Sequence, residues 1–283
     1  MADLDGRTFL ITGANTGIGK ETARALASRG ARVHIACRSE DKGRNAIEEI
    51  AAQTGSRELG LLLLDLGDLE SVRACAQEFL GRGEPLHVLI NNAGVAGKHG
   101  KTASGFEAAF GANHIGPFLL TSLLLDRIRE SAPARIVNVA STAHYGARGI
   151  DFDAVRKPTR TITGMREYSV SKLANVLHAG ELARRLENTG VTTYSLHPGV
   201  VASDIWRRVP WPVRAVMKRR MISPEEGART PLYCATAPEL ANQSGLYYDE
   251  CAVAQPGAAV TASLAAELWR RSADWVGAVG SAG

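Results

Sequence analysis

Short runs of β-type residues alternate with longer segments of helical periodicity along most of this chain. The seven expected strands lie at residues 8–12, 32–36, 61–64, 88–91, 135–139, 192–196 and 245–248. Helical patterns cover about 260–275 and begin near Gly17, Ser39, Leu69, Phe106, Arg166 and Pro224. Parallel strands need long crossover connections, usually helices, and these connections are right-handed. The alternation therefore predicts an α/β fold, a doubly wound, mostly parallel, seven-stranded sheet with helices on both faces.

Size and composition favour a single domain over residues 1–283. The chain has 283 residues, of which 45% are hydrophobic, and no repeat, linker or low-complexity segment divides it. Two stretches lack clear periodicity, residues 142–165 and residues 200–223. Each follows the carboxyl end of an expected strand, where ligands bind in an open α/β sheet, so we expect both to wall a substrate site.

Composition also argues against several other classes of protein. The net charge is only +4 and the basic residues are scattered, which does not favour a nucleic-acid partner. The four cysteines form no Cys-x-x-Cys pair and the seven histidines show no metal-ligand spacing, so we expect free thiols and no metal. No signal peptide is visible, and the longest apolar run, residues 59–64, is too short to span a bilayer. We therefore expect a cytoplasmic protein without a transmembrane segment.

A glycine-rich turn follows the first expected strand, with the sequence TGANTGIG over residues 12–19. Glycines there let the backbone approach a pyrophosphate closely, while the amides at the helix N-terminus attract its charge. A turn of this kind alone also suits an ordinary connection from strand to helix. The contacts with a dinucleotide cofactor expected in this turn are Gly13, Asn15, Thr16, Gly17, Ile18 and Gly19.

Arg38 follows the second expected strand and bears on the choice of cofactor. An acidic residue at this place would bind the adenosine ribose of NAD(H) and repel a 2′-phosphate. The guanidinium of an arginine suits a phosphate, so the sequence favours NADP(H), with NAD(H) as the alternative and a merely solvated arginine as the simpler interpretation. Further contacts with the cofactor are expected after the third and fourth strands, at Asp65, Leu66, Asn92, Ala93 and Gly94.

Tyr168 and Lys172 lie four residues apart in an expected helix, so their side chains share one face. A free tyrosine has a pKa of about 10, and a neighbouring ammonium favours the phenolate and so lowers that pKa. Lys172 is also placed to hold a nicotinamide ribose, and Ser141, after the fifth expected strand, to hydrogen-bond a substrate oxygen. Asn113 is a poor helix former inside a helical pattern, which favours a bend or a site for bound water.

Together these motifs resemble the short-chain dehydrogenase/reductase family over about residues 6–248, with NNAG at 91–94 and HPG at 197–199 in the family's order. The resemblance implies a single Rossmann domain and an oxidoreductase in which Tyr168 is the general acid or base. In that family Ser141 would position the carbonyl, and Lys172 would lower the pKa of Tyr168 and hold the ribose. Asn113 would hold the water of a proton relay. Contacts with the cofactor are further implied for Pro198, Gly199 and Val201.

Finer features resemble the soluble bacterial members of the retinol dehydrogenase-like branch, among them ACR at 36–38, NHIGPF at 113–118 and IDF at 150–152. Members of that branch commonly use NADP(H) on lipophilic carbonyls. The resemblance therefore implies a small-molecule substrate, a lipophilic aldehyde or ketone or the corresponding alcohol. Two departures are Thr16, where many NADP-using relatives have a basic residue, and the lack of a visible apolar anchor. The direction of the reaction stays open. The competing class of function is a redox sensor that binds the nucleotide without turnover.

Two further regions bear on the substrate and on partners. The stretch at about 200–223 mixes Trp206, Trp211 and other apolar residues with many basic ones, which predicts a lid over an apolar substrate. Contact with an anionic membrane surface and a packed surface helix are the alternatives. The helix that begins near Arg166 is apolar over more than one stripe, so it is expected to be buried on two sides. Related enzymes often pair through this helix, whereas the long segment before Tyr168 can instead cover it and leave a monomer.

Overall fold

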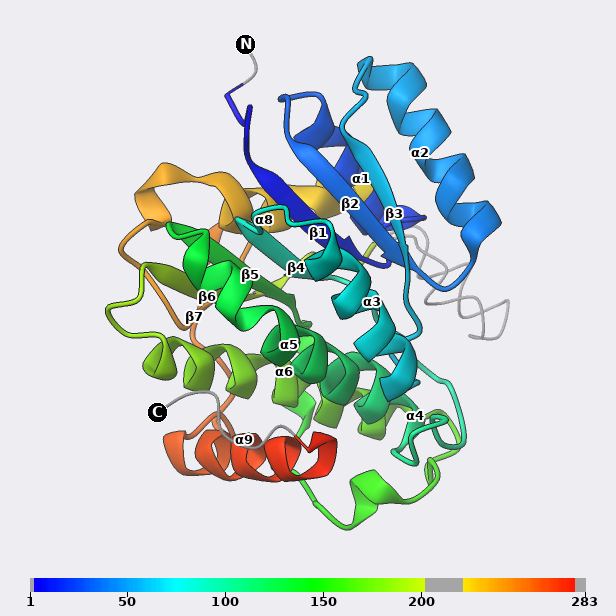
Figure 1. Cartoon of the computed structure of the whole chain (residues 1–283). Helices are drawn as coiled ribbons and strands as arrows, with labels where there is room; N and C mark the ends of the chain where they lie inside the picture. The colour runs from blue at the N-terminus through cyan, green and yellow to red at the C-terminus, as the bar shows by residue number, and fades with distance from the viewer. Residues whose placement is uncertain (1–2, 202–220, 278–283) are drawn as a thin grey trace.

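The structure, a computed structural model, describes residues 3–201 and 221–277. These residues build one sheet in the order β3-β2-β1-β4-β5-β6-β7-β8, with helices on both faces (Figure 1). β1 to β7 run parallel to one another, and β8 pairs antiparallel with β7. The strands are β1 (Thr8–Thr12), β2 (Arg32–Cys37), β3 (Leu59–Leu63), β4 (Val88–Asn91), β5 (Ala134–Val139), β6 (Val191–His197), β7 (Leu246–Asp249) and β8 (Ala252–Val253).

The predicted doubly wound, mostly parallel sheet is confirmed, with one strand more than expected. Each of the seven predicted strands is present with ends shifted by no more than two residues. The additional strand, β8, has two residues, and both are exposed. A segment this short and this exposed carries no alternation of polar and apolar residues, which is the signal that identifies a strand in a sequence.

Helices cover both faces because successive residues of each buried strand point to opposite sides of the sheet. In β1, Leu10 packs into one core with α3, α5, α6 and α9, whereas Phe9 and Ile11 pack into the other with α1, α2 and α8. The helices are α1 (Gly17–Ala27), α2 (Glu40–Thr54), α3 (Leu69–Gly81), α4 (Ala108–Phe110), α5 (Gly116–Glu130), α6 (Met165–Arg185), α8 (Pro224–Thr236) and α9 (Ala262–Val276).

A π-helical turn interrupts the long helical pattern that begins near Phe106. This turn (Gly111–Ile115) joins α4 to α5 and contains Asn113, the residue whose low helix propensity predicted an irregularity. By length and composition alone, Ala108–Glu130 is the one helix in the described part of the chain that could cross a membrane. However, 83% of its most apolar window is buried inside the protein, which is typical of a core helix.

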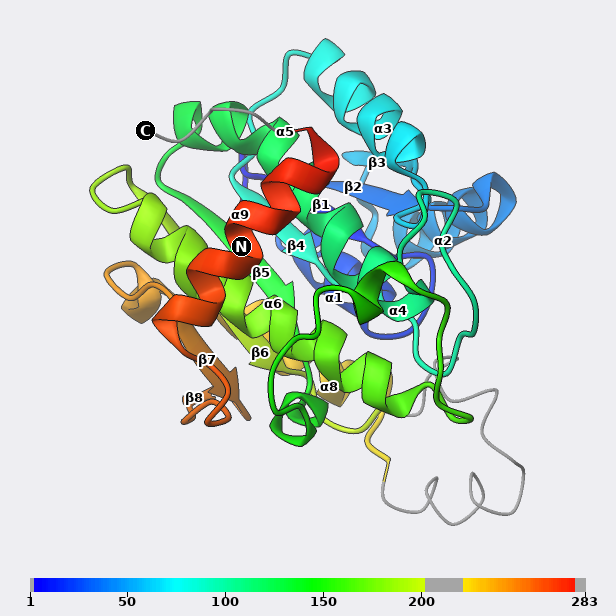
Figure 2. The same ribbon diagram turned by 90° about the horizontal axis from the view of Figure 1, so that it is seen from below.

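α9 lies across α5 and α6 on the outer face of the fold (Figure 2). The ring of Trp269 on α9 lies 5.0 Å from the ring of Phe118 on α5 and 5.7 Å from that of His178 on α6, measured between centroids. α6 is therefore buried on two sides, as expected. Both α9 and the long segment before Tyr168 pack against α6, and Gly146 of that segment lies beside Ser169.

Candidate active site

A cleft of about 850 Å³ opens at the carboxyl ends of the central strands. All of the residues predicted to bind the cofactor or to act in catalysis line it, with the exception of Asn113. The structure thus brings together at one edge of the sheet side chains that lie far apart in the sequence. Lining residues that the sequence analysis missed include Lys42, Lys98, Met165 and His197.

The glycine-rich turn packs directly against the end of β4. Gly13 (φ +68°) and Gly17 (φ +57°) adopt the left-handed conformation that favours glycine. A Cβ on Gly13 would lie 2.9 Å from the Cα of Ala93, and one on Gly19 would lie 2.4 Å from Asn92 Nδ2. Asn92 Nδ2 in turn donates to the carbonyl of Thr12 over 2.8 Å. Asn92 lines the cleft as predicted, but its side-chain amide already stabilises the turn through this hydrogen bond.

The N-terminus of α1 leaves its first amides available to a ligand. Thr16 is the N-cap, yet its side chain accepts no hydrogen bond from the first turn, and that turn contains no acidic residue. By contrast, the N-cap side chains of α2, α3, α8 and α9 all accept such a bond. Uncapped amides, the helix dipole and glycines that admit close approach fit a pyrophosphate. The residues present therefore fit a dinucleotide cofactor.

Two cations without ion-pair partners lie at the end of β2. Arg38 and Lys42 line the cleft and are exposed, and in residues 3–201 and 221–277 neither forms a salt bridge. Ser39 between them caps α2 by accepting a bond from the Lys42 amide. Asp65, the carboxylate predicted to bind the cofactor, is engaged because its Oδ1 accepts from the amide of Gly67 over 2.8 Å.

Tyr168 and Lys172 lie side by side on the buried face of α6. Tyr168 is 5% exposed and Lys172 is 3% exposed, and Lys172 Nζ lies 5.7 Å from the centroid of the Tyr168 ring. The ammonium donates to the carbonyl of Val139 over 2.7 Å. Burial lowers the pKa of Lys172 to about 8 because it disfavours the charged form.

The expected lowering of the tyrosine pKa is not found. Burial raises the pKa of Tyr168 to about 12, and a hydrogen bond with the Ser141 side chain opposes this shift only in part. Desolvation of the phenolate thus outweighs any attraction from the neighbouring ammonium. Tyr168 is consequently protonated at neutral pH.

Ser141 follows β5, and its hydroxyl group can donate a hydrogen bond. Its Oγ accepts a hydrogen bond from the amide of Ala143 over 3.1 Å, which fixes the oxygen. That bond uses only a lone pair, so the hydroxyl hydrogen that stabilises the Tyr168 phenolate can also be donated to an oxygen bound in the cleft.

Asn113 lies behind the cleft wall and is 1% exposed. Its side chain bonds both the amide and the carbonyl of Val95, over 2.8 and 2.9 Å, and donates to Ser171 Oγ over 2.9 Å. Its own carbonyl accepts from Asn175 Nδ2 over 2.8 Å. In this structure Asn113 supports the wall at Val95, and a role in a proton relay stays a prediction.

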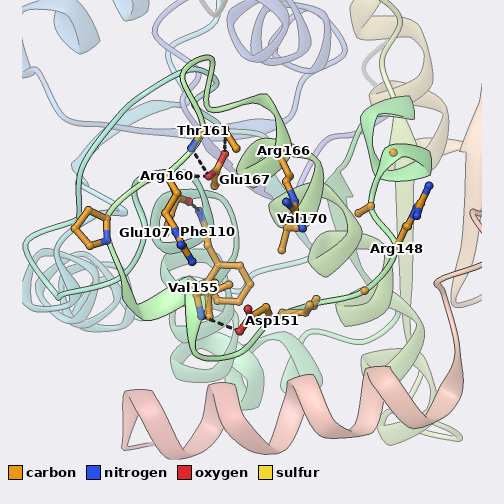
Figure 3. A pocket seen from close by; sticks show the side chains of 16 residues that line it. Glu107, Phe110, Arg148, Asp151, Val155, Arg160, Thr161, Arg166, Glu167 and Val170 are labelled. Carbon is orange, nitrogen blue, oxygen red and sulfur yellow. Dashed lines mark hydrogen bonds between the residues drawn. The ribbon is translucent and has the colours of Figure 1, made fainter.

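A second cavity of about 890 Å³ shares no lining residue with the cleft (Figure 3). It faces the opposite side of the first turn of α6. Its carboxylates are engaged by the backbone, since Glu107 accepts from the amides of Ala109 and Phe110, and Glu167 accepts from that of Thr161. These bonds hold the long segment before Tyr168 in place, and none of the residues predicted to bind the cofactor or to act in catalysis lies here. Much of the expected substrate wall at residues 142–165 lines this cavity, whereas Thr142, Ala143 and Met165 of that stretch line the cleft.

Comparison with known proteins agrees with this geometry. Residues 7–152 match the family model described as short chain dehydrogenase. Mouse retinol dehydrogenase 11 is 46% identical over 281 residues, which cover 97% of this chain and 87% of that protein. Human retinol dehydrogenase 12 is 50% identical over 254 residues, which cover 88% of this chain and 79% of that protein.

Solved structures show the same fold. An uncharacterized protein from Mycobacterium paratuberculosis superposes with a TM-score of 0.77 at 33% identity, over 98% of this chain and 96% of that one. The actinorhodin polyketide ketoreductase with NADPH gives a TM-score of 0.68 at 26% identity, over 92% of this chain and 100% of that one.

The chain therefore belongs to the short-chain dehydrogenase/reductase family, as the motifs predicted. Like the family, it is an oxidoreductase that acts on CH–OH or C=O groups with a nicotinamide cofactor. It is similar to retinol dehydrogenases over most of its length, which confirms the predicted branch.

Proposed function

We propose that this enzyme uses NADPH to reduce a lipophilic aldehyde or ketone. The observation that carries the choice of cofactor is Arg38, an exposed guanidinium at the end of β2 that forms no salt bridge within the described residues, with Lys42 in the first turn of α2. An acidic residue at the place of Arg38 would favour NAD(H). Both cations have their charge available for a 2′-phosphate.

The protonated state of Tyr168 fits the role of the acid in carbonyl reduction. A nicotinamide cofactor, when bound, would supply the hydride. Ser141 donates a hydrogen bond to the carbonyl oxygen, and Tyr168 transfers its phenolic proton to that oxygen as negative charge develops there. Because burial keeps Tyr168 protonated, the residue is ready as an acid, whereas oxidation of an alcohol needs the phenolate. Lys172, held by the Val139 carbonyl, is placed to bind the ribose.

The substrate class is inferred from the wall of the cleft. The lining of the cleft includes the apolar residues Val95, Ala96, Ala143, Met165 and Val200. Such a wall favours lipophilic substrates over charged ones. The similar proteins include retinol dehydrogenases, and retinol is a lipid alcohol, which agrees with this class.

The predicted lid lies largely outside the described residues, since 202–220, with Trp206 and Trp211, fall in the gap. Its two ends are described. Val201 and Ile222 pair in a bridge, and the Ile222 amide donates to the carbonyl of Val200 over 3.0 Å. The segment therefore leaves and returns at the cleft, which supports the proposal that it closes over the substrate.

Replacing Arg38 tests the cofactor proposal directly. We expect Arg38→Ala to lower kcat/KM for NADPH by about 10- to 100-fold, the value of a lost hydrogen bond to a charged group, and to leave kcat/KM for NADH within about twofold. The matched control is Arg44→Ala in α2, the helix that follows Arg38; its guanidinium pairs with Glu40 and does not line the cleft. Equal losses with both cofactors, or a wild-type preference for NADH, would support the NAD(H) alternative.

A further inference from the structure

His144 fixes the backbone of Ser141. The carbonyl of Ser141 accepts two hydrogen bonds from this one residue, from His144 Nδ1 over 2.6 Å and from the His144 amide over 3.1 Å. On the other side of the same peptide, the Thr142 amide donates to His197 Nδ1 over 3.4 Å. The turn that carries the Ser141 hydroxyl is thus held by two imidazoles.

The partners of His144 require a single tautomer. A carbonyl oxygen only accepts, so Nδ1 carries the proton that it donates to Ser141. The Gly257 amide only donates, over 3.0 Å to His144 Nε2, so Nε2 is unprotonated. The ring is 0% exposed, and its burial lowers its pKa, which keeps it neutral. His144 therefore has one donor and one acceptor, and both are used.

The ring of His144 also connects Ser141 to the segment that follows β8. It packs against the rings of Tyr145 and Tyr247, with centroid distances of 4.1 and 4.8 Å. The hydroxyl of Tyr145 donates to the carbonyl of Gln255 over 2.7 Å. A Cβ on Gly257 would lie 3.4 Å from His144 Cδ2, so the backbone there rests close against the ring.

We infer that His144 is a positioning residue for the reaction, because its Nδ1–H holds the Ser141 carbonyl and so aims the Ser141 hydroxyl at the substrate oxygen. A donor to the transition state must be placed accurately, and a shift of about 1 Å costs up to about 100-fold in rate. Ser141 Oγ is held on its other side by the Ala143 amide, which belongs to the same turn. Movement of the Ser141 carbonyl therefore moves the hydroxyl as well. This inference rests on the role proposed above for Ser141.

Two amide substitutions separate positioning from packing. Asn places its NH₂ close to the position of the imidazole Nδ1, so His144→Asn keeps a donor for the Ser141 carbonyl. Gln places its polar end near Nε2, so His144→Gln retains a partner for Gly257 and loses the donor to Ser141. Both remove the aromatic ring, so both lose its packing against Tyr145 and Tyr247.

We expect His144→Asn to keep kcat for carbonyl reduction within about threefold of the wild type, and His144→Gln to lose about 10- to 100-fold, with KM for NADPH unchanged in both. The control Tyr145→Phe keeps its ring and loses only the bond to Gln255, and its kcat should equal that of the wild type. Wild-type kcat in the Gln variant, or equal losses in both amide variants, would overturn the inference.

Two further measurements keep the test decisive. Ser141→Ala reports on the proposed function separately: if it retains full kcat, the role of Ser141 fails, and if it loses kcat while His144→Gln does not, only the role of His144 fails. Nitrogen-15 NMR of histidine in the wild-type protein needs no variant. The Nδ1–H tautomer at His144 is the expected result, and the Nε2–H tautomer would contradict the inference.

Discussion

At the scale of single residues, burial decides the chemistry of Tyr168 and Lys172. Their spacing predicted a shared helix face, and the structure places both on the buried side of α6. The same burial shifts the two pKa values in opposite directions, upward for the phenol and downward for the ammonium. Each residue is therefore held closer to its neutral form than in water.

The pH dependence of stability should reveal the buried lysine. Below pH 8 Lys172 is protonated in the folded and the unfolded chain, but between pH 8 and 10.5 the unfolded chain binds a proton here that the folded chain does not. Stability of the wild type relative to Lys172→Met should therefore rise with pH through this window, by roughly 3 kcal/mol in all. Urea unfolding of both proteins at about pH 7 and pH 10 measures the difference. A difference that does not change with pH would show that Lys172 is not desolvated as described.

At the scale of elements, the connection from β1 to α1 is the part of the site that sequence reasoning predicted most fully. Glycines at 13, 17 and 19 indicated close backbone approach, and the structure shows what they approach, namely the end of β4. The uncapped N-terminus of α1 is the feature that fits the cofactor. The sequence alone does not reveal it, because a threonine at the N-cap, here Thr16, usually accepts a hydrogen bond from the first turn.

Replacing Gly19 by alanine should disturb this connection. Its Cβ would lie 2.4 Å from Asn92 Nδ2 and 2.8 Å from the Gly13 carbonyl, so either the turn or the end of β4 must move. We expect Gly19→Ala to weaken NADPH binding at least about tenfold, as a shift of the anion-binding amides would. The matched control is Gly180→Ala in α6, where no atom lies within 4 Å of the added Cβ; it should be stabilising by about 0.5–1 kcal/mol. Fluorescence titration and thermal unfolding measure both, and unchanged affinity in Gly19→Ala would refute the tight packing.

Periodicity predicted the elements and their order because burial imposes a period of two on strands and of 3.6 on helices. Contacts between distant segments produce no comparable periodicity in the sequence. Asn113 bonds to Val95, Gly257 donates to His144, and α9 packs on α6. These contacts join residues whose separation in the sequence follows no fixed spacing. Arg38 was predicted from its place after a strand, but Lys42 was not, because a lysine on an exposed helix is ordinary unless the cleft beside it is known.

At the scale of the whole molecule, α9 packs on α5 and on α6, the helix that the resemblance to the family marked as a pairing surface. Trp269 packs on both helices, and His114 Nε2 is 2.9 Å from Ser272 Oγ of α9. We therefore expect a monomer. Light scattering of the full chain should give a mass near the 30.1 kDa of one chain. A stable dimer with α9 in place would contradict this expectation.

Removing the anchor of α9 should destabilise the fold. Trp269→Ala leaves a gap beside Phe118 and His178 and should lower the free energy of unfolding by about 2–4 kcal/mol. The control on the same helix is Arg270→Ala, whose guanidinium is exposed and paired only with Glu267 and Asp274, and it should change stability by less than about 1 kcal/mol. Equal unfolding midpoints in urea for the two variants would mean that α9 contributes little to the core.

The central claim, that Tyr168 in this cleft protonates a carbonyl while NADPH is oxidised, is tested most directly by Tyr168→Phe. The measurement is NADPH consumption with a lipophilic aldehyde, alongside the affinity for NADPH. We predict a loss of about 10²- to 10⁴-fold in kcat, the usual contribution of a general acid, with NADPH affinity unchanged. Turnover by Tyr168→Phe at the wild-type rate would contradict the account.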